Sequence, residues 1–193
     1  MYIEFLIFLI IILLVKLYTE QKNNQKHREG LYIKSTIDNQ EYFVKNTDDK
    51  EEAANLIATL KNKLINFCQC LKKKYPEKDN VKRLIERFNS NNIEEGMEDK
   101  YTSYSVNKGE KIVLCLRHRS GKLKGQLQDI NTLMFVVLHE LAHICSISYH
   151  HTSEFYDNFA FLMKEAIDCG YYIPITLPKK YCGLTITSSP LDT

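Results

Sequence analysis

The stretch "VVLHELAHICSISYHHTSEF", residues 136–155, contains four of the six histidines of the chain. The first two of them, His139 and His143, are four residues apart within a run of apolar residues. In a helix, residues at this spacing lie one above the other on the same face. Two imidazoles on one helix face can hold one Zn²⁺ ion, and Glu140 would stand beside the metal. The pattern therefore predicts a zinc site on a helix.

Residues 132–146 are predicted to form this helix. Asp129 or Asn131 can cap its start, and apolar residues cover nearly its whole circumference, which indicates a helix buried in the core. The alternative is that the two histidines and the glutamate are polar core residues satisfied by hydrogen bonds. Burying these side chains without partners would cost several kcal/mol, so the metal interpretation is favoured.

A zinc ion that does chemistry needs a third protein ligand and an open fourth position for water. Two adjacent histidines, His150 and His151, follow the first helix after a short turn. A second amphipathic helix is predicted to begin near Thr152 or Ser153, with Phe155 on its apolar face. A ligand at the start of that helix would be held rigidly. The spacing places both histidines near this start and leaves the choice between them open.

These residues resemble the minimal zincin metallopeptidases of the WLM and SprT-like type. The shared pattern is HExxH, here "HELAH", followed after a short turn by H-x-x-x-F, here "HTSEF". The resemblance implies that His151, four residues before Phe155, is the third ligand in preference to His150. It covers residues 100–170 best, and the turn before His151 is longer than is usual in WLM proteins. The same residues are similar to WLM-like proteins of large DNA viruses.

The resemblance also implies a fold and a reaction. The fold is α+β, with a zincin-like metallopeptidase domain over residues 31–193 and a small antiparallel sheet packed on the HExxH helix. The reaction is hydrolysis of a protein or peptide substrate through a zinc-activated water, with Zn²⁺ as cofactor and Glu140 as general base. A further donor would stabilise the oxyanion. Tyr149, His150 and Tyr156 are candidates because they are near the site in sequence, and roles in packing or in a solvated turn are the alternative for each.

Residues 111–117 are dense in β-branched and apolar side chains and are predicted to form a strand. They are the second arm of a hairpin over residues 102–117, with its turn at residues 107–110. This strand is a candidate for binding an extended peptide by strand addition, and an ordinary sheet strand is the alternative.

The remaining patterns predict the rest of the domain. The expected elements are a hairpin with its turn at residues 38–40, a helix from Thr47 or Asp48 to Lys74 that ends before Pro76, a shorter helix over residues 81–88, a loop over residues 89–101, and irregular chain after Gly170 that packs back over the domain.

Residues 1–18, "MYIEFLIFLIIILLVKLY", are predicted to form a single-pass transmembrane anchor. As a helix they would span about 27 Å, close to the thickness of the hydrocarbon layer. A cleaved signal peptide is the alternative, but no small-residue cleavage site follows. Residues 19–30 form a polar juxtamembrane linker whose basic residues place the domain on the cytosolic side by the positive-inside rule. The membrane would be that of a host cell or a virion.

The six cysteines bear on the same question of compartment. An even number permits disulfides in an oxidising compartment. None forms a CxxC pair, and Cys68 and Cys70, two residues apart on a predicted helix, point to different faces. The chain also has no N-x-[ST] glycosylation site. Reduced thiols and a cytosolic domain are therefore predicted.

Three functions are compatible with these patterns. The leading hypothesis is a membrane-anchored zinc endopeptidase. The second is a non-enzymatic, zinc-stabilised scaffold on a membrane or virion, although a purely structural zinc usually has four protein ligands. The third, implied by the resemblance, is a protease that repairs protein–DNA crosslinks.

The net charge of the chain bears on the third hypothesis. A value of +2 produces no strong field for nucleic acid. We recognise no DNA-binding tail, so no specific nucleic-acid partner is expected. The sequence makes no prediction of oligomeric state.

Overall fold

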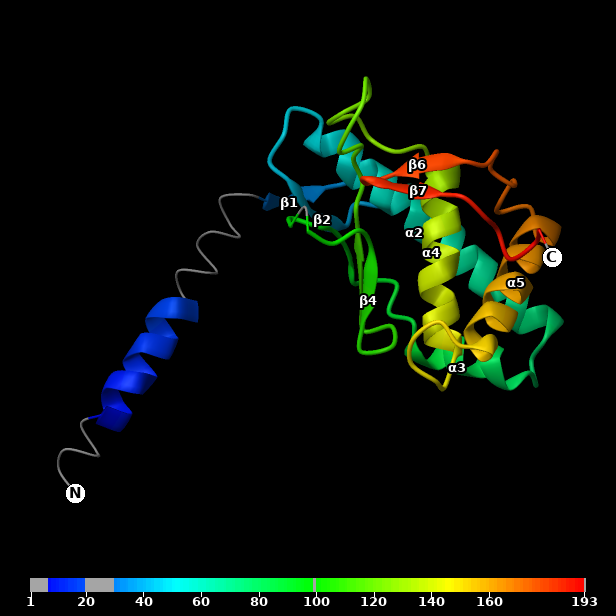
Figure 1. The fold of residues 1–193 in the computed structure, drawn as a ribbon, viewed down its shortest axis with the longest axis horizontal. Coiled ribbons are helices and arrows are strands. Elements are labelled where there is room, and N and C mark those ends of the chain that lie inside the picture. Colours follow the sequence, from blue (N-terminus) through cyan, green and yellow to red (C-terminus); the bar gives the residue numbers. More distant parts are fainter. Residues whose placement is uncertain (1–6, 20–29, 99, 193) are drawn as a thin grey trace.

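The computed structural model describes residues 7–19, 30–98 and 100–192, which form an α+β fold as predicted (Figure 1). The helices of the domain are α2 (Lys50–Lys74), α3 (Asp79–Arg87), α4 (Ile130–Cys145) and α5 (Ser153–Asp168). The strands are β1 (Gly30–Lys34), β2 (Glu41–Lys45), β3 (Ile93–Glu95), β4 (Tyr104–Val106), β5 (Lys111–Leu114), β6 (Lys179–Tyr181) and β7 (Leu184–Ile186).

Helix α4 lies between α5 on one side and β4 on the other (Figure 1). Its start is capped by Asp129, whose side chain accepts a hydrogen bond from the backbone N–H of Thr132 at 2.8 Å. This bond satisfies one of the donors that a helix N-terminus leaves free. Leucine side chains of α4 are fully buried and each contributes about 1.5–3 kcal/mol to stability; they are Leu133, Leu138 and Leu141. The predicted buried helix is confirmed.

Helices α2 and α3 also match the predicted pattern. The apolar positions of α2 that recur at threes and fours are buried, and they include Ile57, Leu60, Leu64, Phe67 and Leu71. Three lysines, residues 72–74, occupy its last turn, where positive charge interacts favourably with the helix dipole. Helix α3 begins at Asp79 and buries Val81 and Leu84 against the same core.

The sheet beside α4 has the strand order β3-β5-β4. Strands β4 and β5 form the predicted antiparallel hairpin, but β3 pairs with β5 in parallel, so the sheet is mixed and the prediction of an antiparallel sheet was wrong in this respect. Strand β3 falls in a predicted loop because three residues are too few to show an alternating pattern. Its Glu95 is buried and forms an ion pair with Arg117 at 2.9 Å.

This strand order also decides between a peptide-binding strand and an ordinary sheet strand at residues 111–117, in favour of the sheet strand. Strand β5 forms the first part of the predicted strand over residues 111–117. It lies between β3 and β4, so both of its edges are occupied. An extended peptide has no edge of β5 to pair with. In the described part of the chain, β4 pairs with β5 alone and is therefore the edge strand on the side of α4.

Two hairpins lie outside this sheet. Strands β1 and β2 form the predicted N-terminal hairpin of the domain. Strands β6 and β7 form a second hairpin within the segment that was predicted to be irregular. The chain after β7 runs beside α5 (Figure 1).

The prediction of reduced thiols was wrong for four of the cysteines. Disulfides join Cys70 to Cys169 and Cys115 to Cys182, while Cys68 and Cys145 are free and buried. The paired cysteines are 99 and 67 residues apart in sequence, and packing of α2 on α5 and of the β6–β7 hairpin on β5 brings them together. The cysteines therefore no longer support a cytosolic location of the domain.

The predicted anchor lies partly outside the described residues. Residues 7–19 are helical and exposed, whereas residues 1–6 and most of the predicted linker are not described. Within residues 7–19, 30–98 and 100–192, no helix combines the length and apolar character that crossing a bilayer requires.

Candidate metal centre

Three histidines converge at one place in the domain. His139, His143 and His151 each offer one ring nitrogen, and these nitrogens all lie within 4.8 Å of one another. The Nε2 atoms of His139 and His151 are 3.1 Å apart. The structure thus gathers the two HExxH histidines and His151. In the described residues His150, which has a positive φ of 66°, is outside this group.

The local fold explains how the three rings meet. His139 and His143 are one turn apart on α4, and His151 directly precedes Thr152, whose hydroxyl caps α5 by accepting a hydrogen bond from the N–H of Phe155. The fully buried ring of Phe155 lies against all three imidazoles, at centroid distances of 4.8, 4.3 and 4.6 Å. The ring of Phe155 therefore restricts the orientations of the three histidine rings.

The donor set fits a zinc ion. Four-coordinate zinc with nitrogen ligands at 2.0–2.1 Å separates neighbouring nitrogens by about 3.3 Å, close to the 3.1 Å between His139 and His151. Burial and the neighbouring histidines lower the pKa of His139 to about 3 and that of His143 to about 4. Both rings are therefore neutral at pH 7, and neutral imidazole is the form that binds metal. The three residues could hold one metal ion.

Glu140 lies beside this group and is only 5% exposed. Burial raises the pKa of its carboxyl to about 7, although hydrogen bonds with the side chain and backbone of Ser105 act in the opposite direction. Ser105 belongs to the edge strand β4. The carboxyl group is thus held between α4 and the sheet and can accept or release a proton near neutral pH.

A cleft passes over the histidines and Glu140. Its larger part has a volume of about 900 Å³ and is lined by residues of β4, α4, the α4–α5 turn and the β6–β7 hairpin. A second part of about 490 Å³ shares His139, His151, Phe135 and Ile186 with the first and continues along α5 and the C-terminal chain. The candidate metal site is therefore open to a ligand that extends on both sides of it.

The WLM domain family model matches residues 38–176, which is more than half of the chain. The chain belongs to the WLM domain family. Its relatives include Uncharacterized protein R325 of Acanthamoeba polyphaga mimivirus, which is 40% identical over 167 residues, 82% of this chain and 83% of that protein. Uncharacterized protein 042R of Invertebrate iridescent virus 3 is 43% identical over 99 residues, 50% of this chain and 57% of that protein. The predicted family and the likeness to proteins of large DNA viruses are confirmed.

Two solved structures are also similar. Wss1 from Saccharomyces cerevisiae aligns with a TM-score of 0.45 and 25% identity, over 62% of this chain and 81% of that chain. A Wss1 mutant from the same yeast aligns with a TM-score of 0.47 and 24% identity, over 66% of this chain and 90% of that chain. Assignment to the WLM family rests on the sequence comparisons, and that family supports a protease-like function.

The three candidate oxyanion donors of the WLM domain all line the cleft. Tyr149 and His150 lie along its larger part, and Tyr156 lies along its smaller part. Tyr149 is 72% exposed, and its ring lies 4.6 Å from the ammonium group of Lys108. The ring of Tyr156 is 6.3 Å from that of His151. Their location is compatible with the predicted role, which stays a prediction.

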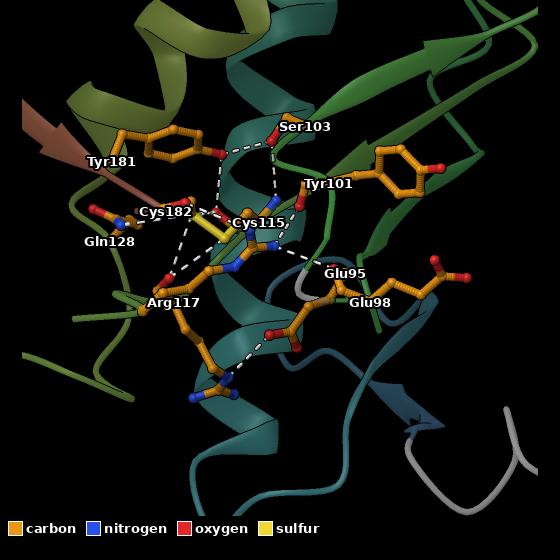
Figure 2. The surroundings of a disulfide bond; sticks show 10 residues. Glu95, Glu98, Tyr101, Ser103, Cys115, Arg117, Gln128, Tyr181 and Cys182 are labelled. Atoms are coloured by element: carbon orange, nitrogen blue, oxygen red, sulfur yellow. Dashed lines mark hydrogen bonds and ion pairs between the residues drawn. A yellow bond between two sulfur atoms is a disulfide. The ribbon is translucent and has the colours of Figure 1, made fainter. Parts of the chain in front are cut away.

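Several residues of the site could not be recognised in the sequence. Tyr181, on β6, lines the cleft and is almost fully buried, and its hydroxyl donates a hydrogen bond to the carbonyl of Cys115 at 2.9 Å. Figure 2 shows Tyr181 and Cys182 beside Cys115 and Ser103, with the disulfide between the two cysteines. The hairpin that lines the cleft of the WLM domain is thus fastened to the end of β5. No motif marks this contact, because its members are 12 to 78 residues apart.

Proposed function

We propose that this WLM protein is a zinc-dependent endopeptidase that hydrolyses peptide bonds in a protein or peptide substrate. The observation that carries the proposal is the convergence of three imidazole nitrogens within 4.8 Å of one another, beside a buried glutamate and within a large cleft. Three protein ligands are the number typical of catalytic zinc, because such sites keep the fourth position for water. A structural zinc needs neither the glutamate nor the cleft.

Each residue of the site would have a distinct role in the reaction. His139, His143 and His151 hold the zinc ion through their ring nitrogens. When bound, zinc lowers the pKa of water and polarises a substrate carbonyl. Glu140 accepts the proton of the attacking water and then gives it to the leaving amine. A carboxyl whose pKa burial raises to about 7 is suited to both steps at neutral pH.

The substrate would bind in an extended conformation along β4. Tyr104, Ser105 and Asn107 of this edge strand and its turn line the larger part of the cleft, which His151 also lines. A peptide paired with β4 would form hydrogen bonds with backbone groups of that strand that Glu140 does not already engage, and would pass over the histidines. This arrangement replaces the peptide-binding strand over residues 111–117 that the sequence predicted.

Glu140→Gln tests the proposed chemistry. The amide keeps the size of the side chain but cannot accept the proton, so we expect zinc content near that of the wild type and a loss of cleavage of an unfolded protein such as denatured casein. Zinc is measured by elemental analysis and cleavage by gel electrophoresis. Glu52→Gln, an exposed position in the first turn of α2, is the matched control and should retain activity. Cleavage at the wild-type rate by Glu140→Gln would exclude the mechanism.

Two alternative functions have distinguishable outcomes. A zinc-bound wild-type protein that cleaves no unfolded substrate would favour the scaffold, particularly if His150 as well as His151 binds the metal. A crosslink-repair protease would bind DNA with an affinity that falls steeply as the salt concentration rises. We favour the endopeptidase because the described site contains both a proton acceptor and a cleft for substrate.

The proposal includes a membrane anchor formed by residues 1–18, with the catalytic domain on the cytosolic face of a host or virion membrane. The apolar run of this segment supports it, and so do the basic residues that follow. The full chain should then stay in the membrane pellet after extraction with alkaline carbonate, and protease should reach the domain in permeabilised cells only. Release by carbonate would exclude an integral anchor.

A further inference from the structure

We propose that Lys108 positions His151 for metal binding, by fastening the β4–β5 turn to the α4–α5 turn. This inference rests on the metal site of the proposed function and concerns a residue that no motif marks. Lys108 lies at the tip of the hairpin whose strand β4 lines the cleft, and it is a positioning residue because its contacts are with the turn that carries His151.

The ammonium group of Lys108 faces a set of carbonyl oxygens at the end of α4. Its Nζ atom lies within hydrogen-bonding distance of the carbonyls of His143, Ser146, Ile147 and Ser148, at 3.2, 3.0, 3.5 and 2.5 Å, so that they share its three N–H groups. The last carbonyls of a helix have no partner within the helix and carry the negative end of its dipole. A lysine ammonium has three donors and a full charge, which matches such a cluster of acceptors. The ring of Tyr149 also contacts the ammonium group, with its centroid 4.6 Å from Nζ.

The backbone of Lys108 is itself held in an unusual conformation. Its φ is 56°, a value that a non-glycine residue adopts only where its surroundings enforce it. The next residue, Gly109, packs so closely that an added Cβ would lie 2.7 Å from the carbonyl oxygen of Arg87, and its own carbonyl accepts a hydrogen bond from Asn89 at 2.9 Å. The lysine therefore projects from a turn that is fixed on α3.

The turn that Lys108 contacts is long and has few other attachments to the sheet. Seven residues, 146–152, separate α4 from α5. Glu154 accepts hydrogen bonds from the N–H groups of Ile147 and Ser148 at 2.8 and 3.0 Å, which ties the turn to α5. Arg83 of α3 donates to the carbonyl of Cys145 at 2.6 Å. These contacts come from helices, whereas Lys108 joins the turn to the hairpin that contains β4.

This link has a consequence for the cleft. Residues of β4 and the third candidate ligand both line it, and the side chain of Lys108 joins the β4–β5 turn to the turn that leads to this ligand. Burial lowers the pKa of Lys108, which agrees with an ammonium group partly withdrawn from water. Without the lysine, the carbonyls of His143, Ile147 and Ser148 lose their charged partner, and the residues that lead to His151 gain freedom. Arg83 and Arg87 still donate to other carbonyls at the end of α4. His151 would then have to be ordered when metal binds, and affinity would fall.

Lys108→Met in the full chain tests the inference, with zinc affinity measured by competition against a chelator. The substitution keeps the length of the stem and removes the ammonium group. We expect affinity to fall by about tenfold or more, the cost typical of losing a residue that orients a ligand. Lys111→Met is the matched control: Lys111 is on the same hairpin, but its Nζ pairs with Glu94 at 3.1 Å, so affinity should be unchanged.

A double-mutant cycle separates positioning from a general loss of structure. If Lys108 acts through His151, Lys108→Met should have no further effect on zinc affinity in a His151→Ala background. An equal loss in both backgrounds would show that Lys108 acts through the fold instead. Lys108→Arg retains the positive charge on a planar donor group and replaces Lys108→Met in the cycle if that variant does not fold. Lys108→Arg should lower zinc affinity by less than Lys108→Met, and again only when His151 is present.

The outcomes also separate this inference from the proposed function. Wild-type protein that binds zinc, together with Lys108→Met that binds it equally tightly, overturns the role of Lys108 and leaves the endopeptidase proposal standing. Wild-type protein that binds no zinc overturns both.

Discussion

The Nε2 atoms of His139 and His151 lie 3.1 Å apart, although twelve residues and a helix end separate them in sequence. Two ring nitrogens at this distance share either a proton or a metal ion. Burial and the neighbouring histidines lower the pKa of His139 to about 3, so its ring is neutral at neutral pH, which is the form that binds metal. A hydrogen bond between two neutral rings needs no third partner, whereas a metal ion does. The ring nitrogen of His143, which completes the group, therefore favours a metal ion.

His151→Ala should weaken metal binding, whereas His150→Ala should leave it unchanged. His151 belongs to the group of three nitrogens, whereas His150 lies in the turn with a positive φ and is outside that group. We expect zinc affinity to fall by more than about 100-fold in His151→Ala, since losing a ligand costs more than losing a residue that orients one. His150→Ala should bind zinc as the wild type does. Equal losses in the two variants would contradict the assignment.

The metal-free protein should lose stability as the pH falls from 6.5 toward 4. The pKa of His139 is about 3 and that of His143 about 4 in the folded chain, whereas both groups titrate near 6.5 when unfolded. Below pH 6.5 the unfolded chain therefore binds more protons, and the free energy of unfolding decreases. Urea denaturation in the presence of a chelator, between pH 4.5 and 7, measures this dependence.

Glu140 acts with the opposite sign and provides a control for that experiment. Its pKa is raised from 4.5 to about 7 in the folded chain, so its contribution to stability is present below pH 4.5 and is lost as the pH rises through 7. In Glu140→Gln this opposing contribution is absent. The increase in unfolding free energy between pH 4.5 and 6.5 should then be steeper than in the wild type, by about one bound proton. Parallel curves would show that Glu140 is not buried as described.

Removal of the Cys115–Cys182 disulfide should affect the cleft as well as stability. The disulfide fastens the β6–β7 hairpin (Figure 2). Tyr181, Leu184 and Ile186 of this hairpin line the cleft. The double substitution to alanine should lower the unfolding free energy by about 2–5 kcal/mol, as is typical for a native disulfide. Because the hairpin is released, KM for a peptide substrate should increase, while zinc content stays unchanged.

The Cys70–Cys169 disulfide provides the comparison. It joins α2 to the end of α5, and neither cysteine lines the cleft. Its removal should lower stability by a similar amount and leave KM near the wild-type value. If both double variants change KM equally, the effect follows from general loosening of the domain, and the hairpin has no special role in forming the cleft.

The sequence was sufficient to predict the elements whose side chains repeat at a regular spacing. The buried face of α2, the cap at Asp129 and the hairpin around the turn at residues 107–110 follow from local chemistry and match the structure. Strand β3 did not follow, because its placement depends on pairing with β5 and on the ion pair between Glu95 and Arg117.

The site was predictable to a similar extent. The HExxH pattern and the nearby histidine pair identified the residues that converge, because a helix fixes the relation between His139 and His143. The contributions of Lys108 and Ser105 were hidden, since each acts on groups 35 or more residues away in sequence. Disulfide pairing was hidden for the same reason: cysteine spacing does not reveal which helices and hairpins pack together.

Ser105→Ala should shift the pH dependence of cleavage toward higher pH. Hydrogen bonds with the side chain and backbone of Ser105 stabilise the charged carboxylate of Glu140 and lower its pKa, against the larger effect of burial. Alanine removes the hydroxyl and keeps the backbone N–H, so the pKa of Glu140 rises further. Since the carboxylate form is the proton acceptor, the acidic limb of the profile of kcat/KM against pH should move upward.

Ser105→Thr is the matched variant, because it keeps a hydroxyl at the same position on the edge strand β4. Its profile should lie close to that of the wild type. Zinc content should be equal in all three proteins, which separates an effect on Glu140 from one on metal binding. An acidic limb that stays in place in Ser105→Ala, with reduced kcat at every pH, would mean that Ser105 supports the substrate-binding strand and has no influence on the proton acceptor.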